Sequence, residues 1–153
     1  MALRIPSPLA KHLQDRDVAR FFDYVTKPRD VALFMLMLRC GLRVEEVAHL
    51  TLGDIDYSRS QIMVRCGKGK KDRVVYISND AASALAKYLR KRPVTREQSI
   101  FLVEKGVYRG QPISVRGIQK RIEYYSRKSG IEVSCHQLRH NADTSIMPTT
   151  LNE

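Results

Sequence analysis

The sequence contains few cysteines and no long apolar run. These two features argue against a disulfide-rich secreted protein and against a membrane-spanning protein. Cys40, Cys66 and Cys135 are odd in number, widely spaced and form no CxxC pair, so we expect reduced thiols. No uninterrupted apolar stretch approaches the roughly 20 residues of a membrane-spanning helix, and the first residues lack the apolar segment of a signal peptide. These features predict a cytoplasmic protein.

Acidic residues are also scarce relative to basic ones. Sixteen Asp and Glu face 27 Lys and Arg, which gives a net charge of +11 in 153 residues. The length and the 43% hydrophobic content are typical of one folded domain. The charge favours a polyanionic partner, with nucleic acid as the first candidate, although ribosomal proteins, histone-like proteins and nucleases share this property.

The N-terminal third shows helical periodicity after a short lead-in. Residues 1–14, with two prolines, predict a linker. Asp15 is a candidate N-cap for a first helix. A second helix, apolar almost all round and therefore buried, is expected from Pro28 until Gly41 ends it. Residues 51–60 are expected to form a loop.

The middle of the chain predicts a small antiparallel sheet. Gln61–Arg65 and Arg73–Ile77 alternate like strands and flank a turn rich in glycine and lysine, Cys66–Asp72, so they predict a hairpin. Ile100–Val103 is expected as the third strand. The hairpin tip fits a solvated turn and an anion-binding loop equally well.

Helices return in the C-terminal half. Asn79 or Asp80 is expected to cap a helix, and Ser114 opens a longer helix that runs to Gly130. The pattern as a whole predicts an α+β fold that is mostly α, with a three-stranded antiparallel sheet.

The pentad His136-Gln137-Leu138-Arg139-His140 carries the most suggestive chemistry. On a helix, His136 and Arg139 share one face while Leu138 points towards the core. A guanidinium fork and an imidazole suit a tetrahedral anion such as phosphate. A zinc site at His136, His140 and Cys135 is disfavoured, because the HExxH glutamate and further ligands are missing, and we expect no metal or other cofactor.

Upstream, Arg43 and Glu46 stand three apart. Either this spacing makes an ordinary surface ion pair, or Glu46 fixes the direction of the Arg43 guanidinium.

Three segments in this order resemble the catalytic domain of the tyrosine recombinases, the phage integrase family: residues 41–56, 67–73 and 136–140. The resemblance covers roughly residues 15–140. It implies a helical catalytic core with a small sheet, the DNA breaking-rejoining enzyme fold. It also implies site-specific recombination or integration of double-stranded DNA through a 3′-phosphotyrosine, without metal or ATP, in a prokaryotic, phage or mobile-element protein.

The resemblance also assigns residues. It implies that Arg43 and Arg139 clamp the phosphate, that Lys68 protonates the leaving 5′-oxygen, and that His136 assists both tasks. Glu46 is implied as a supporting residue. His140 is expected, apart from the resemblance, to be a structural or supporting residue. The expected DNA-binding residues on the hairpin and on the long helix are Lys70, Lys71, Arg73, Arg116 and Lys120, although a solvated basic face explains the helical ones nearly as well.

The nucleophile is the main departure from the family pattern. All seven tyrosines precede the His136 segment, the last being Tyr125, and residues from Asn141 onward, with Pro148, no longer follow the apolar helix expected there. We therefore expect residues 15–153 to be a catalytic domain truncated before its nucleophile and monomeric without DNA, with full-length protomers as candidate partners. The alternative is a non-catalytic DNA-binding module that occupies recombination sites.

Overall fold

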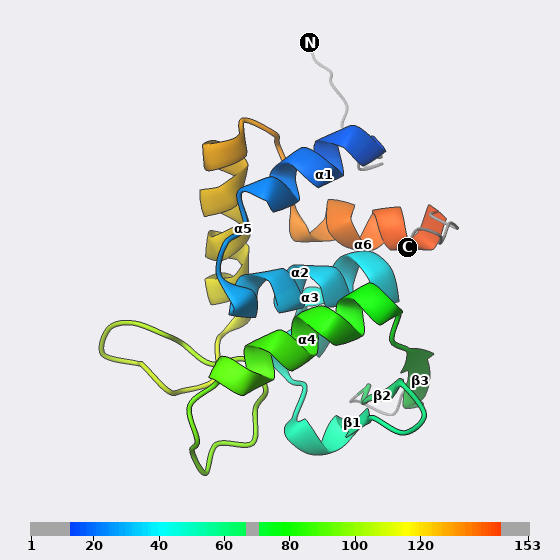
Figure 1. Cartoon of the computed structure of the whole chain (residues 1–153), viewed down its shortest axis with the longest axis vertical. Helices are drawn as coiled ribbons and strands as arrows, with labels where there is room; N and C mark the ends of the chain where they lie inside the picture. Colours follow the sequence, from blue (N-terminus) through cyan, green and yellow to red (C-terminus); the bar gives the residue numbers. More distant parts are fainter. Residues whose placement is uncertain (1–12, 67–70, 145–153) are drawn as a thin grey trace.

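The structure, a computed structural model, describes residues 13–66 and 71–144, which form helices around a small sheet (Figure 1). The elements in chain order are α1 (Asp15–Asp23), α2 (Pro28–Cys40), α3 (Val44–Ala48), the short 3₁₀ helix η1 (Leu52–Asp54), β1 (Ile55–Asp56), β2 (Gln61–Val64), β3 (Arg73–Tyr76), α4 (Asn79–Lys91), α5 (Val115–Ser129) and α6 (Cys135–Thr144). The expected α+β fold, mostly α with a three-stranded antiparallel sheet, is confirmed.

Helix α2 is the centre of the core. It runs between α4 and α6, while α5 stands across its end (Figure 1). Its residues Leu33, Phe34, Leu36 and Met37 are fully buried, as expected for a helix that is apolar nearly all round. Within residues 13–66 and 71–144, no helix combines the length and the apolar character needed to cross a membrane.

The sheet has the order β1-β2-β3, and its third strand differs from the predicted one. Residues 51–60, expected as a loop, contain η1 and β1, and Ile55 pairs with Ile62 of β2. The chain turns there because the Asp54 carboxylate accepts a hydrogen bond from the Thr51 N–H at 2.9 Å. The prediction of a third strand at Ile100–Val103 was wrong, since the segment is not part of the sheet and forms an isolated bridge at Leu102.

The helix ends follow local chemistry. Gly41 and Gly130 end α2 and α5 with left-handed φ values of 70° and 76°, as predicted. Ser114 caps α5, also as predicted.

Two predicted N-caps lie one or two residues too far along the chain. Gln14, not Asp15, occupies the N-cap position of α1. Ser78, not Asn79 or Asp80, caps α4 and accepts a hydrogen bond from the Ala81 N–H. Asp80 also accepts from that N–H, at 2.8 Å, so it contributes to the same cap from inside the helix.

The core begins before α1. Leu13 is buried and exchanges two hydrogen bonds with the Asn141 side chain, one from its N–H at 3.1 Å and one to its carbonyl at 3.0 Å. This contact joins positions 128 residues apart and ties the start of the described chain to α6.

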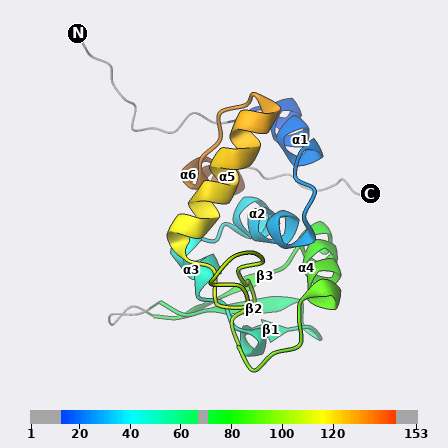
Figure 2. The same cartoon turned by 90° about the vertical axis from the view of Figure 1, so that its left-hand side faces the viewer.

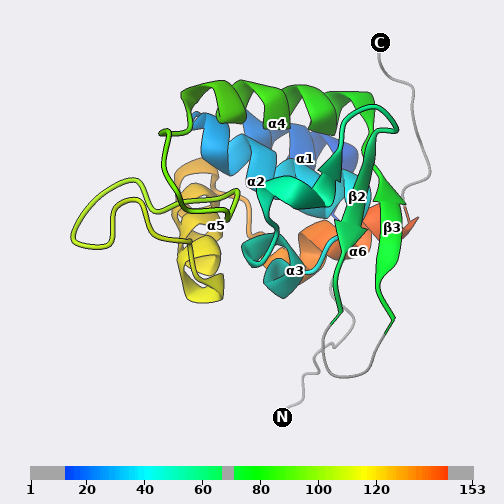
Figure 3. The ribbon, with the colours of Figure 1, turned by 90° about the horizontal axis from the view of Figure 1, so that it is seen from below.

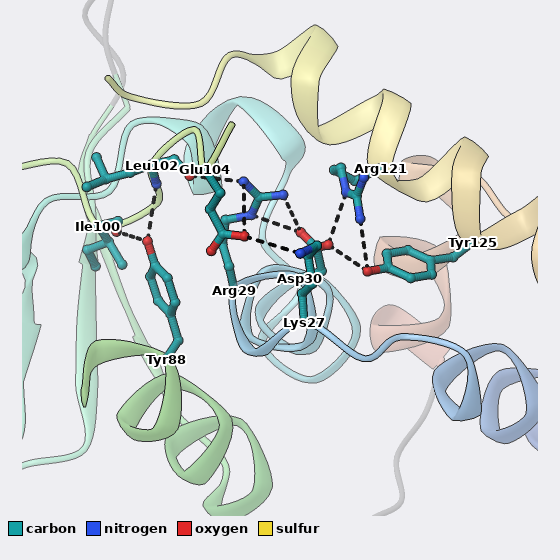
Figure 4. A network of polar contacts seen from close by, with 9 residues as sticks. All are labelled: Lys27, Arg29, Asp30, Tyr88, Ile100, Leu102, Glu104, Arg121 and Tyr125. Atoms are coloured by element: carbon teal, nitrogen blue, oxygen red, sulfur yellow. Dashed lines mark hydrogen bonds and ion pairs between the residues drawn. The ribbon is translucent and has the colours of Figure 1, made fainter. Parts of the chain in front are cut away.

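A buried ionic network joins α2 to α5, and the sequence analysis did not identify it (Figure 4). Asp30 is fully buried and accepts hydrogen bonds from Arg29, Arg121 and the Tyr125 hydroxyl at 2.8–3.0 Å. Arg29 also donates to the Leu102 carbonyl at 3.0 Å. The network therefore fixes α5 and the segment around Leu102 relative to α2.

Candidate phosphate-binding site

A cleft of about 650 Å³ lies between α3, α5 and α6. Arg43, Arg116, His136 and Arg139 line it from three separate stretches of the chain. Figure 3 shows these three helices on the side of the molecule away from α4. Three of the four predicted catalytic residues, Arg43, His136 and Arg139, thus face one cavity.

Arg43 lies at the junction of α2 and α3. Gly41 ends α2, the buried Leu42 anchors the chain, and Arg43 follows in an extended conformation at the N-cap position of α3. The Arg43 N–H donates to Glu46 Oε1 at 2.8 Å, which fixes the backbone from which the exposed guanidinium projects.

Glu46 binds a different arginine side chain from the one considered in the sequence analysis. Its carboxylate receives the Arg73 guanidinium through two hydrogen bonds, at 2.7 and 3.0 Å. Burial opposes ionisation, but the hydrogen bonds from Arg73 and the Arg43 N–H outweigh it and hold the pKa of Glu46 below its ordinary value. The three-residue spacing of Arg43 and Glu46 therefore lets the Glu46 carboxylate bind the Arg43 backbone N–H. The same carboxylate holds the Arg73 side chain, which was predicted to bind DNA.

A reciprocal cap starts α6. The Ser134 Oγ accepts from the Gln137 N–H at 3.2 Å, while Gln137 Oε1 accepts from the Ser134 N–H at 3.0 Å. From this start, His136 and Arg139 both face the cleft and Leu138 is fully buried, as the helical spacing predicted.

Arg139 is joined to the end of α2. Its Nε donates to the Gly41 carbonyl at 3.1 Å, across 98 residues of sequence. Since Arg43 is only two residues further along, this contact brings the two arginines together from opposite ends of the domain. The sequence could place both arginines in one site only through the family resemblance.

Helix α5 adds charges of both signs to the cleft. Arg116 lines it and forms an ion pair with Glu123 at 3.0 Å, and Glu45 of α3 is a second carboxylate in the lining. The sequence analysis identified neither carboxylate. Lys120, one turn beyond Arg116, is exposed.

The remaining predicted residues lie in different places. Lys68 and Lys70 are outside the described residues, as is Pro148. Lys71 is exposed where the described chain resumes, and Figure 2 shows the hairpin arms extending on the side of α3. His140 is half-buried and does not line the cleft.

The cleft suits an anion better than a metal ion. Within the described part of the chain, no three His, Cys, Asp or Glu side chains gather as a metal ligand set. Burial raises the pKa of Cys135 to about 11, which disfavours the thiolate that a metal would bind. Guanidinium groups only donate hydrogen bonds, so Arg43 and Arg139 match the acceptor oxygens of a phosphate.

Comparison with known proteins gives one consistent result. The family model of the phage integrase family matches residues 11–150. Tyrosine recombinase XerA of Thermococcus kodakarensis is 36% identical over 146 residues, which make up 94% of this chain and 51% of that protein. A crystal structure of XerA recombinase matches with a TM-score of 0.81 at 29% identity, covering 92% of this chain and 52% of that one.

XerH site-specific recombinase, in a pre-cleavage complex with its difH substrate, shares the fold. It matches with a TM-score of 0.68 at 22% identity, over 87% of this chain and 41% of that one. The chain spans about half the length of the relatives that it matches.

Proposed function

This chain belongs to the phage integrase family of tyrosine recombinases, and from that premise we propose that its cleft holds one phosphodiester of double-stranded DNA during site-specific recombination. The observation that carries the proposal is the convergence of Arg43, His136 and Arg139, with Arg139 joined to Gly41 at 3.1 Å. The solved relative XerH is bound to a DNA substrate, which supports the same class of partner here.

Each residue has a distinct task in this proposal. Cleaving a phosphodiester without a metal requires stabilisation of the charge that builds on the non-bridging oxygens, and Arg43 and Arg139 supply fixed donors for it. His136 donates a hydrogen bond to the phosphate or transfers a proton near neutral pH. Lys68 remains the proposed donor to the leaving 5′-oxygen, a role that lies outside the described residues.

No tyrosine lies in the cleft as the described residues form it. None of the cleft-lining residues is a tyrosine, and no tyrosine follows Tyr125 in the sequence. We propose that a polypeptide of these 153 residues binds DNA, forms no phosphotyrosyl adduct by itself and is monomeric without DNA. Incubation with nicked duplexes, followed by denaturing gels, tests for the adduct, and a trapped covalent complex would contradict its absence. Light scattering tests the monomeric state.

The central experiment measures phosphate binding in the cleft. Inorganic phosphate, a probe for a single phosphodiester group, is titrated while the arginine Nε–Hε signals are followed by NMR. Removing one charged donor by Arg139→Ala should weaken binding at Arg43 by about tenfold, the effect of one charge-assisted hydrogen bond. Arg127→Ala, which removes an exposed arginine in the last turn of α5, is the matched control and should leave the affinity unchanged.

Two results would reject this phosphate site. One is the absence of any saturable shift at Arg43, and the other is equal affinity in the Arg139→Ala and wild-type proteins. The basic surface would then act through its charge alone, which is the behaviour of a non-catalytic DNA-binding module.

A further inference from the structure

We propose that Arg73 is a positioning residue of the phosphate site, which acts through Glu46 on Arg43 and does not itself bind DNA. The inference rests on the proposed phosphate-binding function and extends it to a residue outside the cleft lining. It depends on the geometry of one carboxylate, which two different segments of the chain share.

The Glu46 carboxylate serves both segments at once. Oε1 accepts the Arg43 N–H at 2.8 Å and Arg73 Nη2 at 3.0 Å, while Oε2 accepts Arg73 Nη1 at 2.7 Å. The fork of Arg73 therefore fixes the plane of the carboxylate, and that plane determines where Oε1 meets the Arg43 N–H. A change at Arg73 should reach Arg43 through this single oxygen.

The Arg73 guanidinium is bound within the protein through both terminal nitrogens, although its side chain is 38% exposed. Its two terminal nitrogens bind Glu46, and Nη1 also lies 3.8 Å from the Cys66 Sγ on the opposite arm of the hairpin. The Glu46 side chain is only 10% exposed, so the pair is shielded on its acidic side. A DNA phosphate at Arg73 would compete with the Glu46 carboxylate for the same guanidinium, so we assign Arg73 to Glu46 and not to a direct DNA contact.

Arg73 also connects the hairpin to the start of α3. It is the first residue of β3. Next to it, the Asp72 carboxylate accepts the Cys66 N–H at 3.1 Å and closes the turn of the hairpin. The Arg73–Glu46 pair spans 27 residues of sequence, so it sets how the hairpin arms lie relative to Arg43. Strand pairing within the hairpin could not do this alone.

The same hairpin provides a matched control. Arg65, on the opposite arm, donates through two nitrogens to Asp54, which in turn accepts the Thr51 N–H at 2.9 Å. Neither Asp54 nor Thr51 lines the cleft. Arg65→Gln therefore removes the same charge and the same kind of ion pair, without touching the residues of the phosphate site.

The test measures the Kd of inorganic phosphate at the Arg43 Nε–Hε signal. Arg73→Gln should raise this Kd roughly tenfold, the effect of losing one well-placed charge-assisted hydrogen bond at Arg43. Arg65→Gln should change it less than twofold. Arg73→Lys keeps the charge but loses the fork, so several-fold weaker phosphate binding is expected. Wild-type phosphate affinity in the lysine variant, or equal changes of the Kd in Arg73→Gln and Arg65→Gln, would overturn the proposal.

A charge-reversed pair distinguishes a role in positioning Arg43 from a role in attaching the hairpin to α3. Glu46→Arg combined with Arg73→Glu can restore an ion pair but leaves no carboxylate to accept the Arg43 N–H. We expect phosphate binding to stay weak in this double variant, while full recovery would show that the pair only fastens the hairpin. If the double variant does not fold, the backbone amide proton of Arg43 in Arg73→Gln replaces it: an upfield shift supports the proposal and an unchanged shift overturns it.

The two proposals fail in different ways. An unchanged Kd in Arg139→Ala would reject the phosphate site itself. A tenfold loss in Arg139→Ala, together with wild-type affinity in Arg73→Gln, would reject only the positioning role of Arg73.

Discussion

Asp30 carries a carboxylate in the middle of an otherwise apolar helical core. Its charge is compensated by Arg29, Arg121 and the Tyr125 hydroxyl, all within 3.0 Å. Asp30→Ala would leave two arginines without their buried partner, so we expect a loss of about 3–5 kcal/mol in the free energy of unfolding. Urea denaturation measures it.

Tyr125→Phe is the control for Asp30→Ala. It removes a single hydrogen bond to the same carboxylate and keeps the ring packing, so about 1 kcal/mol of destabilisation is expected. Equal, small effects in both variants would mean that the network contributes little to stability and that α5 is positioned by apolar packing alone.

Cys135 adds a pH dependence at the edge of the cleft. Burial raises the pKa of its thiol from 9.0 to about 11. The folded state therefore holds this proton more tightly than the unfolded state, and the stabilisation, complete below pH 9, is lost as the pH rises from 9 to 11. Thermal unfolding should show a shallower decline over this range in Cys135→Ala than in the wild-type protein, and parallel declines would contradict the assignment.

The end of α2 links a local structural signal to the site. Gly41 has a φ of 70°, and its carbonyl accepts the Arg139 Nε. Gly41→Ala should cost about 1 kcal/mol in stability, because a side chain is strained in the left-handed region. It should also weaken phosphate binding, since the carbonyl that orients Arg139 would move.

Gly130→Ala is the matched variant for Gly41→Ala. Gly130 has a similar φ of 76°, and a Cβ added there would meet nothing within 4 Å. It ends α5 at a position that does not line the cleft. The same loss of stability is expected without any change in phosphate affinity, as measured by urea denaturation and the NMR titration. Equal phosphate affinities in the two variants would show that Gly41 acts only as a helix end.

Three helix ends were predictable because their causes are local. A glycine after an apolar run, or a serine before one, changes the backbone within two or three residues, and Gly41, Ser114 and Gly130 behave accordingly. The third strand was not predictable in this way. Ile55–Asp56 is too short to alternate visibly, and only its pairing with β2 makes it a strand.

The site was predictable to a different degree for each residue. Helical spacing alone placed His136 and Arg139 on one face of α6, whereas the approach of Arg43 depends on the contact between Arg139 and Gly41. The pairing of Glu46 with Arg73 joins a helix to a strand 27 residues away, and no sequence period encodes such a contact. The carboxylate of Asp30 was overlooked for the same reason.

At the scale of the whole molecule, the excess of positive charge should govern DNA affinity. Each phosphate contact releases condensed counterions, so the logarithm of the association constant should fall linearly with the logarithm of the salt concentration. The slope should follow the number of phosphates that Lys and Arg contact and not the net charge of +11, because residues far from the bound duplex contribute little.

Single lysines on opposite sides of the molecule can locate the DNA-binding face. Lys120 is exposed on α5, one turn from Arg116 of the cleft, while Lys87 is exposed on α4, on the other side of the core. If Lys120 contacts a phosphate, Lys120→Ala should reduce the salt slope by about 1 and weaken binding uniformly across sequences. Lys87→Ala removes the same charge and should leave the slope unchanged in fluorescence anisotropy titrations with a random 30-base-pair duplex. Equal slopes for the two variants would mean that Lys120 makes no phosphate contact and is only a solvated surface residue.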